Sequence, residues 1–386
     1  MSILITGGTG YVGQNLIKEL LNLNYKVIAL VRNIKRAQNI LHPHTSKLKY
    51  VEADLFSINQ IITELINEKV SIVIHLAAEM DFYPKDISKI YRVNVEGTSS
   101  LLKSCKIANK STNNQIIRFI YCSSTETIGP TDGDEPGTEE TPCSPSYHYG
   151  KSKIQAEERV KQFAEKSNIF SLILRPTGIY GPGDRFTIWE LQKMVEWGLL
   201  FFIPGSGNAK LMYTHIDDVV QSFLLSVALP KDRENSIREK NDGKFYETFI
   251  ICPNDVLTYK QWIVLLSQEM DRAVPFLHLP FPMVKLSTAL LAPFMNLGKT
   301  RTFMYQPKTI DRMAENRFYS NNRAKQMLDF VPKYSLRDGL IQTVRFNVSQ
   351  KVIRKWPLSP FLVLSILAFA FVVAAIFPFV FFANAW

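Results

Sequence analysis

Cysteine and histidine are scarce in this chain of 386 residues. Its six histidines are scattered, and its four cysteines form no CxxC pair: Cys105, Cys122, Cys143 and Cys252. These patterns argue against a disulfide-rich secreted scaffold and against the usual zinc-binding spacings. We therefore expect reduced thiols facing the cytosol and no metal site.

We predict no signal peptide, because Met1 runs directly into a predicted strand. No internal repeat or low-complexity block is evident in the sequence. Lys and Arg number 45 against 35 Asp and Glu, which gives a net charge of +10. A nucleic-acid-binding surface would need a basic stripe with interleaved aromatic residues, and none is visible, so no nucleic-acid partner is predicted. The basic balance suits an anionic membrane face.

The length allows a large core and about two domain-sized units. The first strongly patterned segment is a glycine-rich turn between a predicted strand at 2–5 and a predicted helix at 14–23. In this context we expect Gly7 to allow a tight turn, Gly10 to let the backbone approach a pyrophosphate, and Gly13 to let the helix pack close to the strand. The cofactor-contacting residues predicted here are Gly7, Gly10, Tyr11, Val12 and Gly13.

The end of the second predicted strand, 26–31, indicates which dinucleotide binds. NAD-binding enzymes usually place an acidic residue there to hold the ribose hydroxyls, whereas this chain has Arg32, followed by Lys35 and Arg36. A guanidinium pairs with a 2′-phosphate. We therefore favour NADP(H) over NAD(H), which stays possible; the alternative is a solvated basic turn.

Two further strands are predicted to border the cofactor. The third ends at 52–55 and places Asp54 near the adenine amino group, with Leu55 beside it. The fourth, 70–78, ends in Ala77 and Ala78, whose small side chains leave room for a ribose. We interpret His75 in that strand as a packed structural residue.

A hydroxyl, a phenol and an ammonium group follow in the middle of the chain. The buried strand 115–121 delivers Ser124 to the carboxyl edge of the sheet, and residues 145–153 lead into a helix at 154–167. Tyr149 and Lys153 are four apart and share a helix face. We expect the lysine to lower the pKa of the phenol, so that Tyr149 acts as general acid–base while Ser124 holds the substrate oxygen.

A second register is open, because Tyr147 and Lys151 are also four apart. Tyr149 is favoured because Gly150, Ser152, Ala156 and Glu157 then complete the pattern Tyr-Gly-x-Ser-Lys-x-x-Ala-Glu.

With these motifs the chain resembles an extended short-chain dehydrogenase/reductase over residues 2 to about 345. The segments that carry the resemblance are 6–13 (TGGTGYVG), 75–78 (HLAA), 94–98 (NVEGT), 121–124 (YCSS), Tyr149 with Lys153, 174–183 (LRPTGIYGPG) and 215–219 (HIDDV). The resemblance implies that Lys153 also holds the nicotinamide ribose, that Pro176 lies beside the nicotinamide and that Asn94 shapes the site. It leaves a homodimer open.

Within that family the chain looks most like the 3β-hydroxysteroid dehydrogenase branch, on the segments 119–126 (FIYCSSTE), 318–328 (FYSNNRAKQML) and 331–336 (VPKYSL). Cys122 stands where many relatives have Thr or Ser. Arg32 replaces the usual acidic residue, which puts the NAD preference of that branch in doubt. Residues 75–82 (HLAAEMDF) also resemble acyl-thioester reductases.

The C-terminal residues 361–383 carry no charge over 23 positions, which is enough to span ~30 Å of hydrocarbon. Lys351, Arg354 and Lys355 precede them, so we predict a tail anchor over 358–384 with the catalytic body on the cytosolic side. The membrane would be the endoplasmic reticulum in a eukaryote or the inner membrane in a bacterium. Residues 275–297 are a membrane-surface patch, a lid, or ordinary helix and turns. Residues 231–244 are interpreted as a solvated loop.

The predicted fold is a Rossmann-like, doubly wound parallel sheet (1–180) with a C-terminal substrate lobe (181–350) interleaved with late sheet strands. The predicted activity is hydride transfer between NADP(H) and an alcohol or ketone of a small hydrophobic substrate, a sterol or steroid, that arrives through the lipid bilayer. Alternatives are a nucleotide-sugar epimerase or dehydratase, an acyl-thioester or flavonoid-type reductase, and an inactive NADP-sensing protein.

Overall fold

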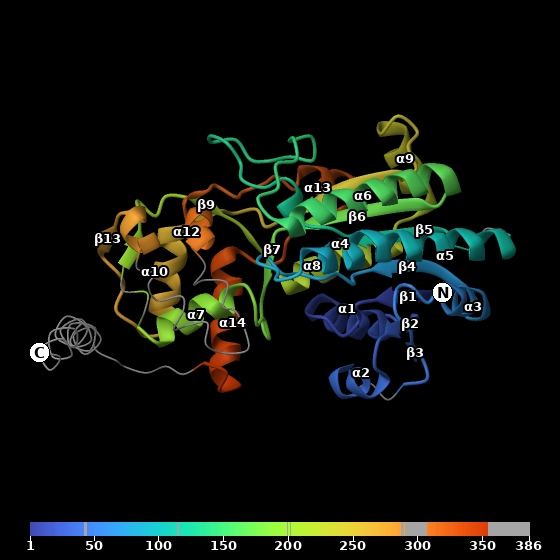
Figure 1. The fold of residues 1–386 in the computed structure, drawn as a ribbon, viewed down its shortest axis with the longest axis horizontal. Helices are drawn as coiled ribbons and strands as arrows, with labels where there is room; N and C mark the ends of the chain where they lie inside the picture. Colours follow the sequence, from blue (N-terminus) through green and yellow to red (C-terminus); the bar gives the residue numbers. More distant parts are fainter. Residues whose placement is uncertain are drawn as a thin grey trace, which may run out of the picture. The chain divides into compact units, whose positions relative to one another are not determined.

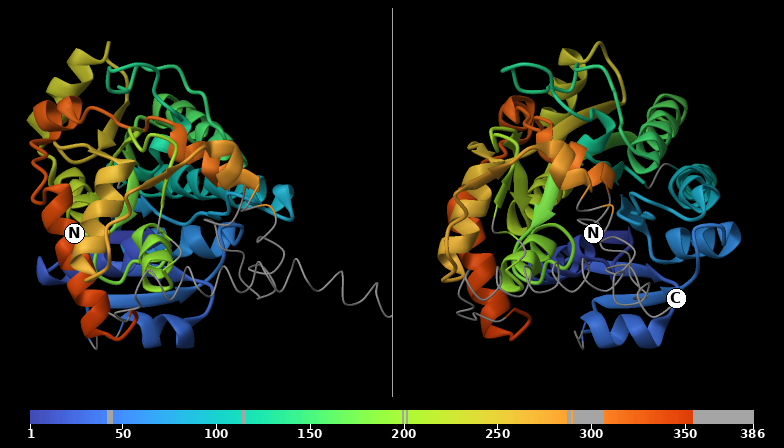
Figure 2. Two further views of the ribbon diagram at one scale, coloured as in Figure 1. Left: turned by 90° about the vertical axis from the view of Figure 1, so that its left-hand side faces the viewer. Right: turned by 60° about the vertical axis from the view of Figure 1, so that its left-hand side comes forward.

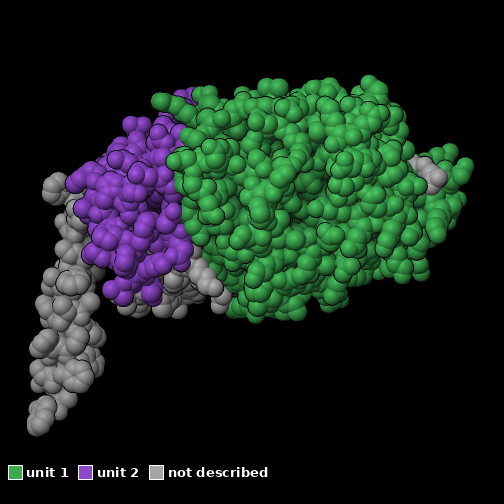
Figure 3. Space-filling model, turned by 90° about the horizontal axis from the view of Figure 1, so that it is seen from above, with its two compact units in different colours: residues 1–184, 210–256, 315–339 green, residues 185–209, 257–314, 340–386 purple. Residues whose placement is uncertain are grey.

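The computed structural model describes residues 1–41, 45–113, 116–198, 200, 202–286, 289 and 307–353. The chain divides into two compact units (Figure 3). Unit 1 contains residues 1–184, 210–256 and 315–339, and unit 2 contains the described residues of 185–209, 257–314 and 340–353. Each unit is therefore assembled from three separate stretches of sequence.

Unit 1 is built on a seven-stranded sheet in the order β11-β6-β5-β4-β1-β2-β3, and all neighbouring strands are parallel (Figure 1). This confirms the predicted doubly wound sheet. In chain order the strands are β1 (Ser2–Thr6), β2 (Lys26–Val31), β3 (Leu48–Glu52), β4 (Val70–His75), β5 (Arg118–Cys122), β6 (Phe170–Pro176) and β11 (Tyr246–Ile251).

Helices cover both faces of the sheet. The helices of unit 1 are α1 (Tyr11–Asn22), α2 (Ile34–Leu41), α3 (Ile58–Asn67), α4 (Ile87–Tyr91), α5 (Gly97–Ser111), α6 (His148–Ser167), α8 (Ile216–Ala228), α9 (Lys231–Lys240) and α13 (Asn322–Leu328). Helix α5 lies between α3 and α6 on one face (Figure 2), and α1 packs beside α8 on the other. Shorter elements are the π-helical turn η1 (Arg92–Glu96), the 3-10 turn η2 (Thr125–Thr127), the paired strands β7 (Gly178–Tyr180) and β10 (Tyr213–His215), and β9 (Lys210–Leu211).

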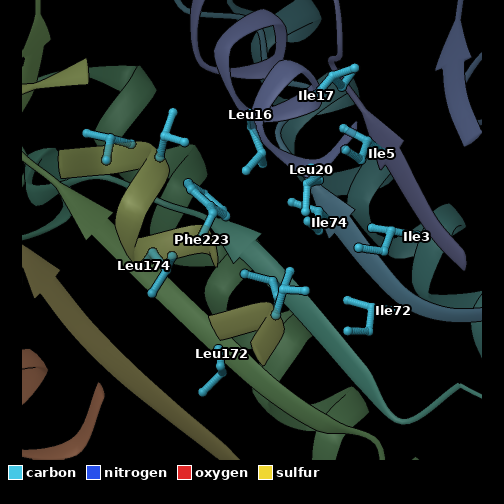
Figure 4. Packing of buried hydrophobic residues seen from close by; sticks show 14 of the residues in the cluster. Ile3, Ile5, Leu16, Ile17, Leu20, Ile72, Ile74, Leu172, Leu174 and Phe223 are labelled. Atoms are coloured by element: carbon cyan, nitrogen blue, oxygen red, sulfur yellow. The ribbon is translucent and has the colours of Figure 1, made fainter. Parts of the chain in front are cut away.

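Two cores form because successive residues of a strand point to opposite faces of the sheet. Ile3 and Ile5 of β1 join the core that contains α1 and α8 (Figure 4), whereas Leu4 joins the core under α3, α5 and α6. Strands buried on both faces read as continuous apolar runs, which is why β1, β2 and β4 were visible in the sequence.

Unit 2 is smaller and mostly helical. Its elements are α7 (Ile188–Glu196), β8 (Phe202–Pro204), β12 (Leu257–Thr258), α10 (Tyr259–Glu269), β13 (Leu277–Leu279) and α12 (Pro307–Ala314), and α14 (Leu336–Ser349) runs into it from unit 1. Strand β13 pairs in parallel with β8. Residues 275–297 thus contain a strand, followed by helical residues at 281–286; most of the remainder falls outside the described residues.

The loop predicted at 231–244 is wrong for most of its length, because α9 spans Lys231–Lys240. Its Glu234 and Ile237 are buried. Arg118, at the first position of β5, donates to the Glu234 carboxylate at 2.9 Å and to the last carbonyls of α8. The charged helix α9 therefore buries Glu234 against Arg118, a partner more than a hundred residues away in the sequence.

Element ends also differ from the predictions. β3 ends at Glu52, β4 ends at His75, and β5 begins at Arg118, so each strand is shorter than its apolar run. The helix expected from 154 begins at His148 instead. Gly150 lets the first turn of this helix pack closely on η2, since a Cβ there would lie 2.3 Å from the Glu126 carbonyl oxygen.

None of the helices that the structure describes is long and apolar enough to cross a membrane. The predicted anchor, 358–384 with its apolar run 361–383, lies outside the described residues.

Candidate active site

The glycine-rich turn connects β1 to α1. Gly7 has φ +74°, and a Cβ there would lie 2.6 Å from the Ala77 backbone nitrogen at the end of β4. A Cβ on Gly13 would lie 2.4 Å from the Gly7 carbonyl oxygen. Gly13 therefore packs α1 against the turn itself, not against the strand as predicted.

The first turn of α1 is open to an anion. Gly10 occupies the N-cap and contributes no side-chain cap, so N–H groups of the first turn remain available at the positive end of the helix dipole. Tyr11 donates from its hydroxyl to the Pro182 carbonyl at 3.1 Å, and Val12 packs against the core. This cradle fits the pyrophosphate of a dinucleotide.

The residues expected at the adenosine end follow β2 and β3. Arg32 comes directly after β2 and is exposed. Asp54 accepts hydrogen bonds from the Phe56 backbone at 2.8 Å and the Ser57 hydroxyl at 3.0 Å. Leu55 is buried against Gly97, whose added Cβ would lie 2.7 Å from it.

The end of β4 is fixed by a buried polar chain. The two ring nitrogens of His75 form hydrogen bonds: Nδ1 with the Thr6 hydroxyl at 2.6 Å and Nε2 with the Thr98 hydroxyl at 2.9 Å. Burial, with a smaller effect of Lys153, lowers the pKa of His75 to about 3. The prediction that His75 is a structural residue is confirmed. Ala77 and Ala78 follow the strand, and the Ala77 N–H points to Thr6 at 3.3 Å.

Asn94 connects two parts of the site. Its side-chain amide donates to the Ser152 hydroxyl on α6 at 2.9 Å and exchanges hydrogen bonds with the backbone of Glu79 at 2.7 and 3.0 Å. Pro176, the last residue of β6, is buried, and the Thr125 hydroxyl donates to its carbonyl at 3.4 Å. Both residues thus lie next to the catalytic segment, and the position of Pro176 beside the nicotinamide stays a prediction.

The three proposed catalytic side chains are brought together. Ser124 caps η2, where its hydroxyl accepts from the Glu126 N–H at 3.2 Å, and it lies close enough to the Tyr149 phenol to lower the pKa of that phenol. Lys153, on the next turn of α6, donates to the Cys122 carbonyl at 2.7 Å, and its ammonium lies 4.8 Å from the ring centre of Tyr121 and 5.8 Å from that of Tyr149. Tyr149 and Lys153 are both buried.

The alternative pair is directed elsewhere. The Tyr147 ring packs edge-on against Phe82 at 5.1 Å and Tyr83 at 5.7 Å, and Lys151 is exposed. The geometry therefore groups Tyr149, not Tyr147, with Ser124.

The expectation that Lys153 lowers the phenol pKa is wrong for this structure. Burial raises the pKa of Tyr149 above its ordinary value, Cys122 and Glu126 act in the same direction, and only the nearby Ser124 hydroxyl opposes them. The Lys153 ammonium is directed at the Cys122 carbonyl, and burial lowers its own pKa. The phenol is thus held firmly protonated, as a proton donor must be.

Sequence reasoning missed two buried ion pairs around this centre. Arg175 donates to the Glu157 carboxylate at 2.8 and 2.6 Å, and Arg317 contacts Glu126 at 3.2 Å. The available signal was a lone charged residue within an apolar run, as in the segment LILRP around Arg175. Among the described residues, no cluster of His, Cys, Asp and Glu could hold a metal.

A parallel sheet with a glycine cradle and a Ser-Tyr-Lys group at its carboxyl edge defines a dinucleotide-dependent enzyme of the short-chain dehydrogenase/reductase type. Residues 3–238 match the NAD dependent epimerase/dehydratase family. The chain belongs to this family and is an extended short-chain dehydrogenase/reductase, as the sequence motifs predicted.

Individual relatives have different activities. The chain is 27% identical over 354 residues to a decarboxylating sterol-4-alpha-carboxylate 3-dehydrogenase of Candida albicans. The alignment covers 89% of this chain and 96% of that protein. It is 23% identical to the N-acetyl-alpha-D-glucosaminyl-diphospho-ditrans,octacis-undecaprenol 4-epimerase of Escherichia coli O157:H7, with coverage of 90% and 95%.

Among solved structures, the UDP-glucuronic acid 4-epimerase of Bacillus cereus, in complex with UDP-glucuronic acid and NAD, superposes with a TM-score of 0.68 at 20% identity. The match covers 91% of this chain and 100% of that one. It shows that the two share a fold.

Proposed function

We propose that the protein is a membrane-attached dehydrogenase or reductase that transfers hydride between NADP(H) and a secondary alcohol or ketone of a sterol or steroid. The observation that carries the proposal is the grouping of Ser124, Tyr149 and Lys153 in a chain of which 89% aligns with a sterol dehydrogenase. Similarity to that enzyme supports the substrate class.

The proton chemistry follows from the geometry. The nicotinamide supplies or accepts the hydride when bound. In this scheme the Ser124 hydroxyl orients the substrate oxygen, and the neighbouring Tyr149 phenol donates or accepts its proton. Lys153 is buried, and its ammonium lies 5.8 Å from the centre of the Tyr149 ring.

Two features support the finer parts of the proposal. Arg32, with Lys35 and Arg36 close behind, suits a 2′-phosphate and favours NADP(H), although the family is defined by NAD. The uncharged residues 361–383, preceded by three basic residues, suit a C-terminal anchor that keeps the enzyme at a bilayer where hydrophobic substrates collect.

A second candidate is epimerisation of a lipid-linked sugar. The undecaprenol-linked substrate in the name of the Escherichia coli relative would give a nucleotide-sugar type of site a reason to stay at a membrane. An epimerase returns the hydride to the same substrate, so it consumes no dinucleotide in net terms.

The test follows oxidation of NADPH and NADH, or reduction of NADP+ and NAD+ for substrates supplied as alcohols, by the detergent-solubilised full chain. The panel contains 3-ketosteroids, sterol 4-carboxylates assayed in the oxidative direction, long-chain acyl thioesters, nucleotide sugars and an undecaprenol-linked sugar. Turnover with the sterol substrates is the expected result. Epimerised sugar without net dinucleotide turnover would favour the second candidate. Tight cofactor binding with no reaction on any substrate would favour an NADP-sensing protein.

A further inference from the structure

Behind the catalytic group lies a buried carboxylate that the reaction scheme above does not use. Glu157 follows Lys153 by one turn of α6 and is 2% exposed. Its carboxylate accepts from Arg175 Nε at 2.8 Å and Nη2 at 2.6 Å, and it also accepts from the Ser123 hydroxyl. The Glu157 side chain thus connects α6 to Arg175 of β6 and to Ser123, the residue next to Ser124.

Burying a carboxylate costs desolvation free energy, which its ion pair repays only with good geometry and further hydrogen bonds, and the Ser123 hydroxyl supplies one of these. The contact with Ser123 fixes the backbone of the turn that presents the Cys122 carbonyl to Lys153 and the Ser124 hydroxyl to Tyr149. The negative charge is also close enough to raise the pKa of Lys153, against the lowering that burial causes.

We propose that Glu157 is a positioning residue of the active site, whose carboxylate, oriented by Arg175, fixes the Ser123–Ser124 turn and supplies the counter-charge of Lys153. The inference rests on the proposed function, because it assigns Glu157 a role through the catalytic group.

The charges around Lys153 determine the sign of the expected effect. Lys153 faces Cys122 at the end of β5, the neutral His75 of β4, and the rings of Tyr121 and Tyr149, and of these groups Cys122, with Glu157, favours its charged form. Glu157→Gln removes a negative charge near Lys153 and takes from Arg175 its hydrogen-bonded carboxylate partner. Both changes disfavour protonated Lys153.

The experiment follows kcat/KM against pH in the direction of ketone reduction for the full-length protein. In Glu157→Gln we expect the loss of activity at high pH to begin about 1 pH unit lower than in the wild type. Ser123→Ala keeps the charge and loses the contact, so kcat should fall about tenfold while the pH profile stays in place. Glu157→Asp keeps the charge on a shorter side chain and should restore the profile but not kcat.

Glu234→Gln is the matched control, because Glu234 forms an equally buried ion pair with Arg118 at the opposite end of β5. It should lower thermal stability and leave kcat and the pH profile unchanged. If Glu157→Gln only loses stability in the same way, or if Ser123→Ala turns over like the wild type, the positioning role is refuted.

Failure of the sterol hypothesis would look different. The assay uses whichever substrate the wild type converts, and if it converts none, the pH dependence of NADPH binding by fluorescence replaces turnover. A binding profile that shifts in Glu157→Gln and not in Glu234→Gln supports the role of Glu157 even when the substrate class is wrong. Superimposable binding profiles overturn it.

Discussion

Tyr149 is a buried phenol whose pKa is raised, and the Ser124 hydroxyl is among its neighbours. We predict that Tyr149→Phe lowers kcat by about 10²- to 10⁴-fold, because the substrate oxygen then lacks its proton donor. Dinucleotide binding should change little. Tyr147→Phe, on the aromatic cluster with Phe82, is the control and should retain kcat. Full turnover by Tyr149→Phe would exclude it as the acid.

Arg32 determines the predicted cofactor preference at the same scale. Arg32→Asp should reverse the ratio of NADPH to NADH affinity, since the carboxylate accepts ribose hydroxyls and repels a 2′-phosphate. Fluorescence titration with both dinucleotides measures the ratio. A wild type that prefers NADH, or a preference that the substitution leaves untouched, would mean that Arg32 is a solvated surface residue.

Single residues were predictable where chemistry is local in sequence. Ser124, Tyr149 and Lys153 lie in short motifs, and the structure groups them as their spacing predicted. The direction of the Tyr149 pKa was not predictable, because it depends on desolvation and on Glu126, which reaches the phenol through the fold. The ion pair of Arg175 with Glu157 was not predictable either, because it depends on how β6 packs against α6.

At the scale of elements, two glycines of the β1–α1 turn have different roles: Gly13 allows close packing, and Gly10 borders the predicted phosphate site. We predict that Gly13→Ala destabilises the protein even without dinucleotide, because its Cβ would meet the Gly7 oxygen at 2.4 Å. Gly10→Ala brings its Cβ to 3.2 Å from that oxygen, which a small shift relieves, so its main effect should be weaker dinucleotide binding. Thermal unfolding with and without NADPH distinguishes the two. Equal melting temperatures for the free variants would contradict this division.

Elements with continuous apolar runs were recognisable from the sequence, whereas α9 was not. A segment rich in Lys, Arg and Glu has no apolar periodicity, and the helix is held by Glu234 and Ile237, whose partners come from β5 and the core. The end of β4 was placed too late because the apolar run continues into residues 76–78, whereas the start of β5 was placed too early because residues 116–117 are also apolar.

For unit 1 as a whole, Asp218 connects α8 to the C-terminal part of the unit, since it accepts from the Lys333 N–H at 2.7 Å. Burial raises the pKa of Asp218 to about 6. The folded state therefore keeps this proton after the unfolded chain has lost it, and the stability contributed by Asp218 falls as pH rises from about 4 to about 6.

We predict that Asp218→Asn removes this decline. The free energy of unfolding of the variant, relative to the wild type, should increase over the same pH window and then stay level. Urea unfolding of both proteins at a series of pH values between 4 and 7 measures the difference. A difference that decreases with pH would mean that the folded state stabilises the carboxylate.

The core around β1 includes residues from both ends of unit 1: Ile3 and Ile5 share it with Ala324, Leu328 and Phe330. During synthesis, the first strand leaves the ribosome long before the residues that complete its covering. At about 5–20 residues per second, that interval is roughly 15 to 65 s. Throughout it, the apolar face of β1 and α1 lacks part of its native cover, so the nascent chain should depend on chaperones more than a fold with local contacts would.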